Sequence, residues 1–194
     1  MCVGDAAASG GHIEVLEWIP IMSLPNIYEE AARFGQLHVI QWAISRKFSL
    51  PSNNRIFAIA AQYRQWEILH FLHKNGFPLT ENVAESAASG GNLEVLKWLV
   101  NNGYKLTKQC AVEAAKKGHS EVFLWLFDNG CQINLSDYYG YYSLNVTNID
   151  ILKWAAANDN NYFKNPRVTE NLLRNNCLED LQWLYENGYF SNHQ

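Results

Sequence analysis

Residues 80–103, TENVAESAASGGNLEVLKWLVNNG, align without a gap with residues 107–130, TKQCAVEAAKKGHSEVFLWLFDNG, at a step of 27 residues. In both segments an alanine pair is followed by a glycine turn and then by a second half that ends in W-L-x-x-N-G. Self-similarity at a period of about 20–50 residues is typical of repeat proteins, in which each unit is one supersecondary element. We therefore interpret the rest of the chain through this unit.

The same unit extends along the whole chain. Its large aromatic residue recurs at steps of 24 to 29 residues, at Trp18, Trp42, Phe71, Trp98, Trp125, Trp154 and Trp183. The alanine pair recurs in the first five copies and is replaced by Ser143-Leu144 and Leu172-Leu173 in the last two. We predict a single repeat domain over residues 1–194. Its approximate repeats are 1–22, 23–50, 51–79, 80–106, 107–134, 135–163 and 164–194.

Each unit is predicted to form two helices. In the first half, Val83 and Ala84 precede the pair Ala87-Ala88 with the spacing of one helix face. In the second half, Leu93, Leu96 and Leu99 share one face, supported by Val95. One unit of this length cannot bury both helices alone, so its stability must come from stacking on its neighbours. The fold class is all-α, an α-solenoid of stacked helix-turn-helix repeats.

The sequence also predicts where the helices begin and end and whether the repeated aromatic residue is buried. Thr80, Thr107 and Ser136 stand where an N-cap is expected, and Asn165-Pro166 has the same role in the last repeat. Gly76, Gly103, Gly130 and Gly188 are expected to end the second helices in the left-handed conformation. Because aromatic residues at helical spacing usually pack, we predict that the repeated tryptophans, and also Trp66, lie in the core. The first repeat has almost no room for a helix before Ala7-Ala8.

Composition excludes several classes of function. The net charge of −4 shows no basic excess, so we expect no binding to nucleic acid or to an anionic membrane. No run of about 18 apolar residues is present that would span a bilayer. The four cysteines are far apart, and His70 and His73 have no partner at ligand spacing, so we expect no metal. We expect no cofactor, no catalysis, and reduced thiols in an intracellular, cytoplasmic protein.

The string A-A-x-x-G-H-x-E-V-x-x-x-L-x-x-x-G resembles the ankyrin repeat, over nearly the whole chain and most clearly over residues 56–134. With W-L-x-x-N-G closing each unit, it resembles the ankyrin proteins of large DNA viruses of amoebae and of some protists. The resemblance implies a solenoid used for protein recognition, without catalysis, and a host cytoplasmic location if the source is viral. Only Phe77-Pro78-Leu79 separate Gly76 from Thr80, so the β-hairpin fingers should be short or absent.

In ankyrin-like stacks the two positions after the alanine pair face the concave groove. In this chain these two positions differ from repeat to repeat, whereas the residues around them are constant. This is expected where one set of residues forms the scaffold and another set binds the partner. From them we predict that the partner-binding residues are Arg33, Phe34, Gln62, Tyr63, Ser89, Lys116, Lys117, Asn145 and Arg174. An ordinary solvated surface explains the same residues equally well. Part of the cluster Tyr138, Tyr139, Tyr141 and Tyr142 is a second candidate patch.

Two functions therefore compete. The first is a scaffold that binds a protein partner of unknown identity through the concave face. The alternative is a structural or assembly protein, viral if the source is viral, that associates weakly with itself through its apolar terminal repeats. Trp183, Leu184 and Tyr189 close to the end of the sequence motivate the alternative.

Overall fold

The computed structural model describes residues 2–20, 26–49, 55–77, 81–131, 133, 148–158, 163 and 166–189. Within these ranges the chain forms thirteen α-helices and no β-strand, so the all-α class is confirmed. The chain divides into two compact units, residues 1–104 and 105–194, which we describe separately. The division falls close to the predicted border between repeats 80–106 and 107–134. The single domain and the repeat limits stay predictions.

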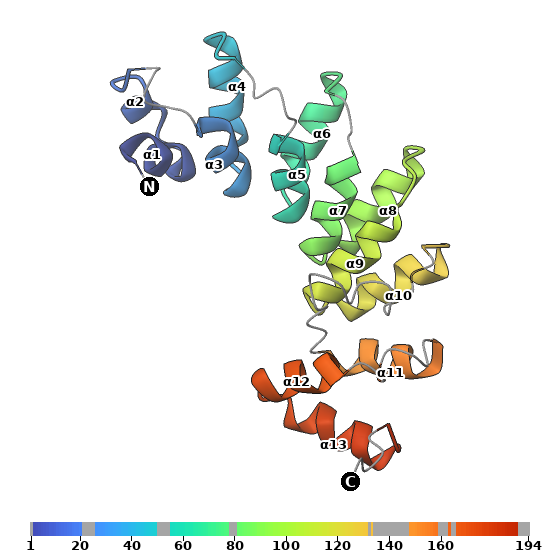
Figure 1. The fold of residues 1–194 in the computed structure, drawn as a ribbon. Helices are drawn as coiled ribbons and strands as arrows, with labels where there is room; N and C mark the ends of the chain where they lie inside the picture. Colours follow the sequence, from blue (N-terminus) through green and yellow to red (C-terminus); the bar gives the residue numbers. More distant parts are fainter. Residues whose placement is uncertain are drawn as a thin grey trace. The chain divides into compact units, whose positions relative to one another are not determined.

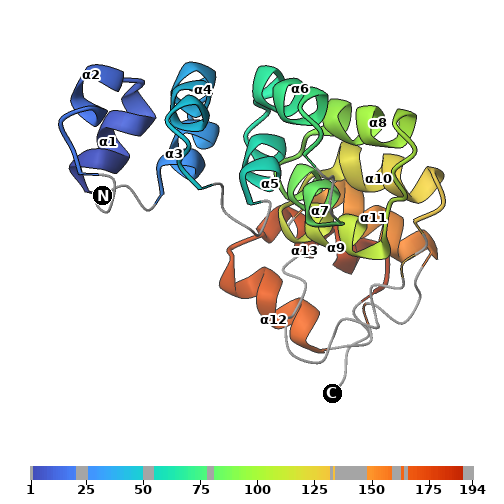
Figure 2. The ribbon, with the colours of Figure 1, turned by 90° about the horizontal axis from the view of Figure 1, so that it is seen from above.

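The first unit contains four helix pairs. Their helices are α1 (Val3–Gly10), α2 (Ile13–Leu16), α3 (Ile27–Arg33), α4 (Leu37–Ser45), α5 (Arg55–Gln62), α6 (Trp66–Lys74), α7 (Glu81–Ser89) and α8 (Leu93–Asn101). Helix α1 packs on α3, α3 on α5 and α5 on α7, while each first helix also packs on the second helix of its own pair. Figure 1 and Figure 2 both show the first helices in one row and the second helices in another.

The second unit continues the same design. It contains α9 (Lys108–Lys116), α10 (Ser120–Asp128), α11 (Ile149–Asn158), α12 (Pro166–Arg174) and α13 (Leu178–Glu186). Helix α9 packs on α10, α10 on α11 and α12 on α13. Several predictions fall outside the described residues: Thr80, Ser136, the tyrosines 138, 139, 141 and 142, Ser143-Leu144, Asn145 and Asn165.

The core follows the predicted faces. Both alanines of the pair are almost completely buried in each of the first five repeats. Val83, Leu96 and Leu99 are also fully buried, as is Cys110, which stands at the position of Val83 one repeat later. Short alanine side chains allow the first helices to approach closely, and the leucines fill the space between the two rows. The predicted apolar faces are therefore confirmed.

The predicted left-handed helix ends are confirmed. Gly76 has a φ of 75°, and its neighbour Phe77 donates its amide to the carbonyl of Leu72 over 3.1 Å, which is the hydrogen bond of a Schellman cap. The same backbone conformation recurs at three residues that are not glycine, at φ values of 58°, 60° and 56°: Lys47, Arg64 and Asn176. The geometry of the turn is therefore kept even where the sequence departs from the repeat.

The prediction that the tryptophans belong to the core is wrong. Trp18 is 84% exposed, and the other tryptophans at the repeated position are only half-buried. Trp66, which lies outside that position, is half-buried as well. The aromatic ring lies at the edge of its second helix, where a neighbouring pair covers one side of it. In the second unit, for example, Phe123 packs against Trp154 with ring centres 4.8 Å apart. How much of each ring is covered therefore depends on the neighbouring repeat.

One of the two testable expectations about helix starts needs correction, and the other is confirmed. The first repeat does contain a first helix, α1, because Cys2 and Asp5 form a capping box that starts it at Val3. The Asp5 carboxylate accepts the amide of Cys2 over 3.0 Å, and the Cys2 thiol accepts the amide of Asp5. Thr107 is the N-cap of α9 as predicted, but its side chain makes no capping hydrogen bond. Its hydroxyl lies 3.6 Å from the Cys110 sulfur instead.

Candidate partner-binding surface

The C-terminal end of helix α3 presents the first two candidate residues. Arg33 is the last residue of α3, and Phe34 follows it as the C-cap with 52% of its surface exposed. The helix ends here because Gly35 takes the left-handed conformation, with a φ of 77°. Phe34 therefore has no place in the core and lies on the surface at the turn.

Arg33 connects this turn to the next repeat. Its guanidinium carbon lies 5.6 Å from the centre of the Tyr63 ring, and Tyr63 is 44% exposed. Arg33 also pairs with Glu30 across one helical turn, at 3.2 Å. A cation over an aromatic face is an attractive contact, stronger where water is partly excluded. We call Glu30, Arg33, Phe34 and Tyr63 the Arg33 cluster.

The backbone beneath this surface is held by side-chain amides from the following repeat. Gln65 Nε2 donates to the carbonyl of Arg33 over 3.1 Å, and Gln36 Nε2 donates to the carbonyl of Ser9 over 3.0 Å. Asn92 Nδ2 donates to the carbonyl of Gln62 over 2.8 Å. The acceptor in all three bonds is the residue directly after the alanine pair. Because these carbonyls already accept hydrogen bonds, we expect side chains and not the main chain to contact a partner at this surface.

The remaining candidates of the first unit are less exposed. Gln62 and Ser89 are half-buried at the ends of α5 and α7, and Ser89 has an interaction of its own. Gly90, beside Ser89, packs directly against the preceding repeat. A Cβ atom at this glycine would lie 2.2 Å from the carbonyl oxygen of Gln62. The C-terminal end of α7 therefore packs two repeats together. Among the candidates of the first unit, Phe34 and Tyr63 are the most exposed.

The second unit holds the basic candidates. Lys116 is half-buried and pairs with Glu113 at 2.9 Å, whereas Lys117 and Arg174 are exposed. Asn145 lies outside the described residues. Among the candidates, the structure brings Arg33 and Tyr63 into direct contact, and both belong to the first unit.

Two residues of this region were not predicted. Glu30 orients Arg33, and it could have been found from its position three residues earlier on a helix. Arg64 replaces the turn glycine in the third repeat and bonds the carbonyl of Gly91 over 3.1 Å, as well as the side chain of Asn92. Arg64 aligns with Gly35 and Gly91 in the sequence, so its turn position could have been predicted. Its hydrogen bonds could not, because their acceptors belong to the neighbouring repeat.

The residues that the structure describes form neither a metal site nor a membrane-spanning helix. In those parts of the chain, no group of three or more histidine, cysteine or acidic side chains is placed to hold a metal ion. His70 and His73 are exposed, and their rings pack against Trp98 with centres 5.6 Å and 5.2 Å away. No described helix combines the length and the apolar character that crossing a membrane requires.

Paired helices, left-handed turns and first helices that stack in a row define a helix-turn-helix repeat protein. The family model described as ankyrin repeats (3 copies) matches residues 57–137, the region in which the repeat is most regular. Residues 57–137 therefore form ankyrin repeats. A comparison with curated proteins gives no match.

Proposed function

We propose that this chain is a non-catalytic scaffold that binds a protein partner through the surface at the ends of its first helices. Ankyrin repeats are generally protein-interaction modules. The observation that carries the proposal is the Arg33 cluster, in which a guanidinium group lies 5.6 Å from an exposed tyrosine ring. Aromatic and arginine side chains are the usual energetic centres of protein interfaces. An intracellular location, in a host cell if the source is viral, stays a prediction from the sequence.

Rigidity supports the same surface. The amides of Gln65 and Asn92 bond the carbonyls of Arg33 and Gln62, in the main chain from which Arg33, Phe34 and Tyr63 project. A partner that binds a surface already held in place loses less conformational entropy than one that must order it. The predicted residues Gln62 and Ser89 belong to the same unit as this surface. Lys116, Lys117, Asn145 and Arg174 stay predictions from the sequence.

The test uses the full chain as bait in an extract of the source cell, followed by identification of the partner and measurement of its affinity. The double variant Phe34→Ala, Tyr63→Ala should weaken binding by at least about tenfold, because a true hot spot contributes about 2 kcal/mol or more. Tyr185→Ala is the matched control, since this tyrosine is exposed but belongs to a second helix. An unchanged affinity of the double variant, with its fold retained, would exclude this surface.

A second candidate function, assembly through the apolar terminal repeats, has an observation of its own. Most of the strongly exposed large apolar side chains among the described residues lie in the first and last helix pairs or directly after them, namely Val3, Trp18, Leu173, Leu178 and Tyr185. Exposed apolar patches favour association. Light scattering over a range of concentrations tests this function, and a strict monomer at high concentration would exclude it.

A further inference from the structure

Four of the second helices end in an asparagine that is followed by a glycine. The four steps are Asn75-Gly76, Asn102-Gly103, Asn129-Gly130 and Asn187-Gly188. The sequence contains no other Asn-Gly step. In an unfolded chain this dipeptide is especially prone to deamidation, because glycine has no side chain to hinder attack by its nitrogen on the asparagine side chain. All eight residues are exposed, so burial does not protect them.

Each of these asparagine side chains is held on the preceding helical turn. Asn102 Nδ2 donates to the carbonyl of Trp98 over 2.8 Å. The same bond, to the aromatic residue four positions earlier, measures 2.7 Å at Asn75 and 2.8 Å at Asn129 and Asn187. The amide group is therefore bound to the helix and points away from the glycine that follows it.

The main chain also keeps the reacting atoms apart. Deamidation begins when the glycine nitrogen attacks the asparagine Cγ atom. The five-membered ring that forms requires Cβ and this nitrogen to lie on the same side of the Cα–C bond. The four asparagines have ψ angles between 9° and 20°. At these angles the glycine nitrogen nearly eclipses the asparagine's own nitrogen and lies away from Cβ, so the ring cannot close.

Two hydrogen bonds oppose rotation out of this arrangement. Gly103 donates its amide to the carbonyl of Val100 over 2.9 Å, and Tyr104 donates to the carbonyl of Leu99 over 3.0 Å. The other three glycine amides donate in the same way, over 3.0 Å or 3.1 Å. The proton that must leave the glycine nitrogen before attack is thus the one held in this bond. Deamidation therefore requires the end of the helix to open first.

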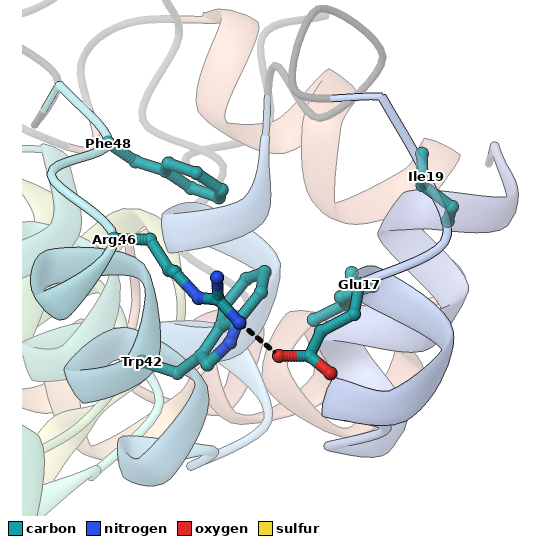
Figure 3. Close-up of a pocket in the computed structure, with 6 residues that line it drawn as sticks. Glu17, Ile19, Trp42, Arg46 and Phe48 are labelled. Carbon is teal, nitrogen blue, oxygen red and sulfur yellow. Dashed lines mark hydrogen bonds and ion pairs between the residues drawn. The ribbon is translucent and has the colours of Figure 1, made fainter.

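The second repeat shows that the turn itself does not need an Asn-Gly step. Arg46 and Lys47 stand at the two positions, and Lys47 still takes the left-handed conformation, with a φ of 58°. The carbonyl of Trp42 accepts a hydrogen bond from the Ser45 hydroxyl over 2.7 Å. Arg46 pairs with Glu17 instead, as Figure 3 shows. The Asn-Gly steps therefore add a chemical reactivity that the fold does not require.

We propose that the four Asn-Gly steps are modification sites controlled by local unfolding, which deamidate when the end of their helix opens and are protected while it is closed. The glycine nitrogen loses its proton and bonds to Cγ, and the side-chain nitrogen leaves as ammonia. Water then opens the succinimide ring and gives aspartate or isoaspartate. Isoaspartate adds a methylene group to the main chain, so the original cap cannot form again. Each modified site is thus an irreversible mark that its repeat has opened.

The rate at each site should follow from how often its helix end opens. Local opening needs less free energy than complete unfolding, and the free energy differs between parts of one chain. The rate in the folded protein equals the rate in the open chain multiplied by the open fraction. Hydrogen exchange of the glycine amide reports the same opening, because it requires the same hydrogen bond to break. The glycine that exchanges fastest should therefore mark the first asparagine to react.

The test incubates the full chain at mildly alkaline pH with and without guanidinium chloride, and mass spectrometry of its peptides gives the deamidation rate at each asparagine. In denaturant the four steps should react at least about tenfold faster than Asn158, and folding should slow each of them at least about tenfold. Asn158 is the internal control. It donates to the carbonyl of Trp154 over 2.9 Å in the same way, but aspartate follows it in the sequence.

A peptide of residues 96–106 in the same two solutions gives the effect of the denaturant on the chemistry alone, and the rates are corrected by it. Equal rates at the four steps with and without denaturant would overturn the proposal, since the folded turn would give no protection. An Asn158 that reacts as fast as the four steps in denaturant would also overturn it. So would an order of reaction in the folded protein that differs from the order of hydrogen exchange at the four glycines. None of these results depends on partner binding at the Arg33 cluster.

Discussion

The side-chain amide of Asn92 donates a hydrogen bond to the main-chain carbonyl of Gln62 over 2.8 Å, across the junction between two helix pairs. Asn92 is only 3% exposed, and it also bonds the carbonyl of Ala61 and the side chain of Arg64. Polar groups buried this deeply are costly when they lose their partners. Asn92 therefore holds the third repeat against the fourth.

Asn92→Leu should lower the free energy of unfolding by about 1–3 kcal/mol, since it leaves buried carbonyls without a donor. Urea denaturation gives the value. Asn102→Leu is the matched control, because Asn102 is exposed and bonds only within its own helix, to the carbonyl of Trp98. Its effect should stay within about 0.5 kcal/mol. Equal losses at the two positions would contradict the role of Asn92 in joining repeats.

Leu96 should contribute to stability through packing between the helix rows. It is completely buried, and Leu96→Ala should cost roughly 2–5 kcal/mol because a cavity is left behind. Leu178→Ala removes the same atoms from an exposed leucine and should cost far less. Chemical denaturation of both variants checks the helical register, and a loss below about 0.5 kcal/mol for Leu96→Ala would contradict it.

Lys47 occupies a turn position that suits glycine better. It is exposed and has a φ of 58°, where a side chain costs roughly 1 kcal/mol. Lys47→Gly should therefore raise the melting temperature. Gly76→Ala is the converse change at the end of α6, where an added Cβ meets no atom within 4 Å, so only the backbone conformation opposes it. It should lower stability by about 1 kcal/mol, and changes of the same sign in the two variants would exclude this explanation.

Tyr28 should make the protein sensitive to alkaline pH. The side chain is buried, its hydroxyl donates to the carbonyl of Phe48 over 2.9 Å, and burial raises its pKa from 10.0 to about 12. The folded state therefore favours the neutral phenol. Its contribution to stability is complete below pH 10 and is lost between about pH 10 and 12, as the unfolded chain ionises first.

The measurement is the free energy of unfolding of the wild type and of Tyr28→Phe at pH 8 and pH 11. The wild type should lose about 1 kcal/mol more than the variant over this interval. Tyr63→Phe changes an exposed tyrosine and should behave as the wild type does. If the free energy of unfolding fell equally in the wild type and in Tyr28→Phe, groups other than Tyr28 would cause the loss of stability at alkaline pH.

The exposure of the candidate residues was predictable in part, because their positions follow from helix periodicity. The residues after the alanine pair must lie at the helix end, and Phe34 and Tyr63 are exposed there as expected. The contact between Arg33 and Tyr63 was not predictable, because its distance depends on how two successive repeats stack.

The sequence by itself determined the helix pairs, their left-handed turns and their buried faces, since these depend on residues within a few positions of each other. The apolar spacing around Ala87 and Leu96 sufficed to assign both buried faces. Only the tertiary structure decided which large side chains are covered. Trp18 and Trp154 occupy the same place in the repeat, yet Trp18 is exposed and Trp154 packs against Phe123 and Phe127. A ring at the edge of a helix is covered only by what its neighbour supplies, and that is a property of the stack.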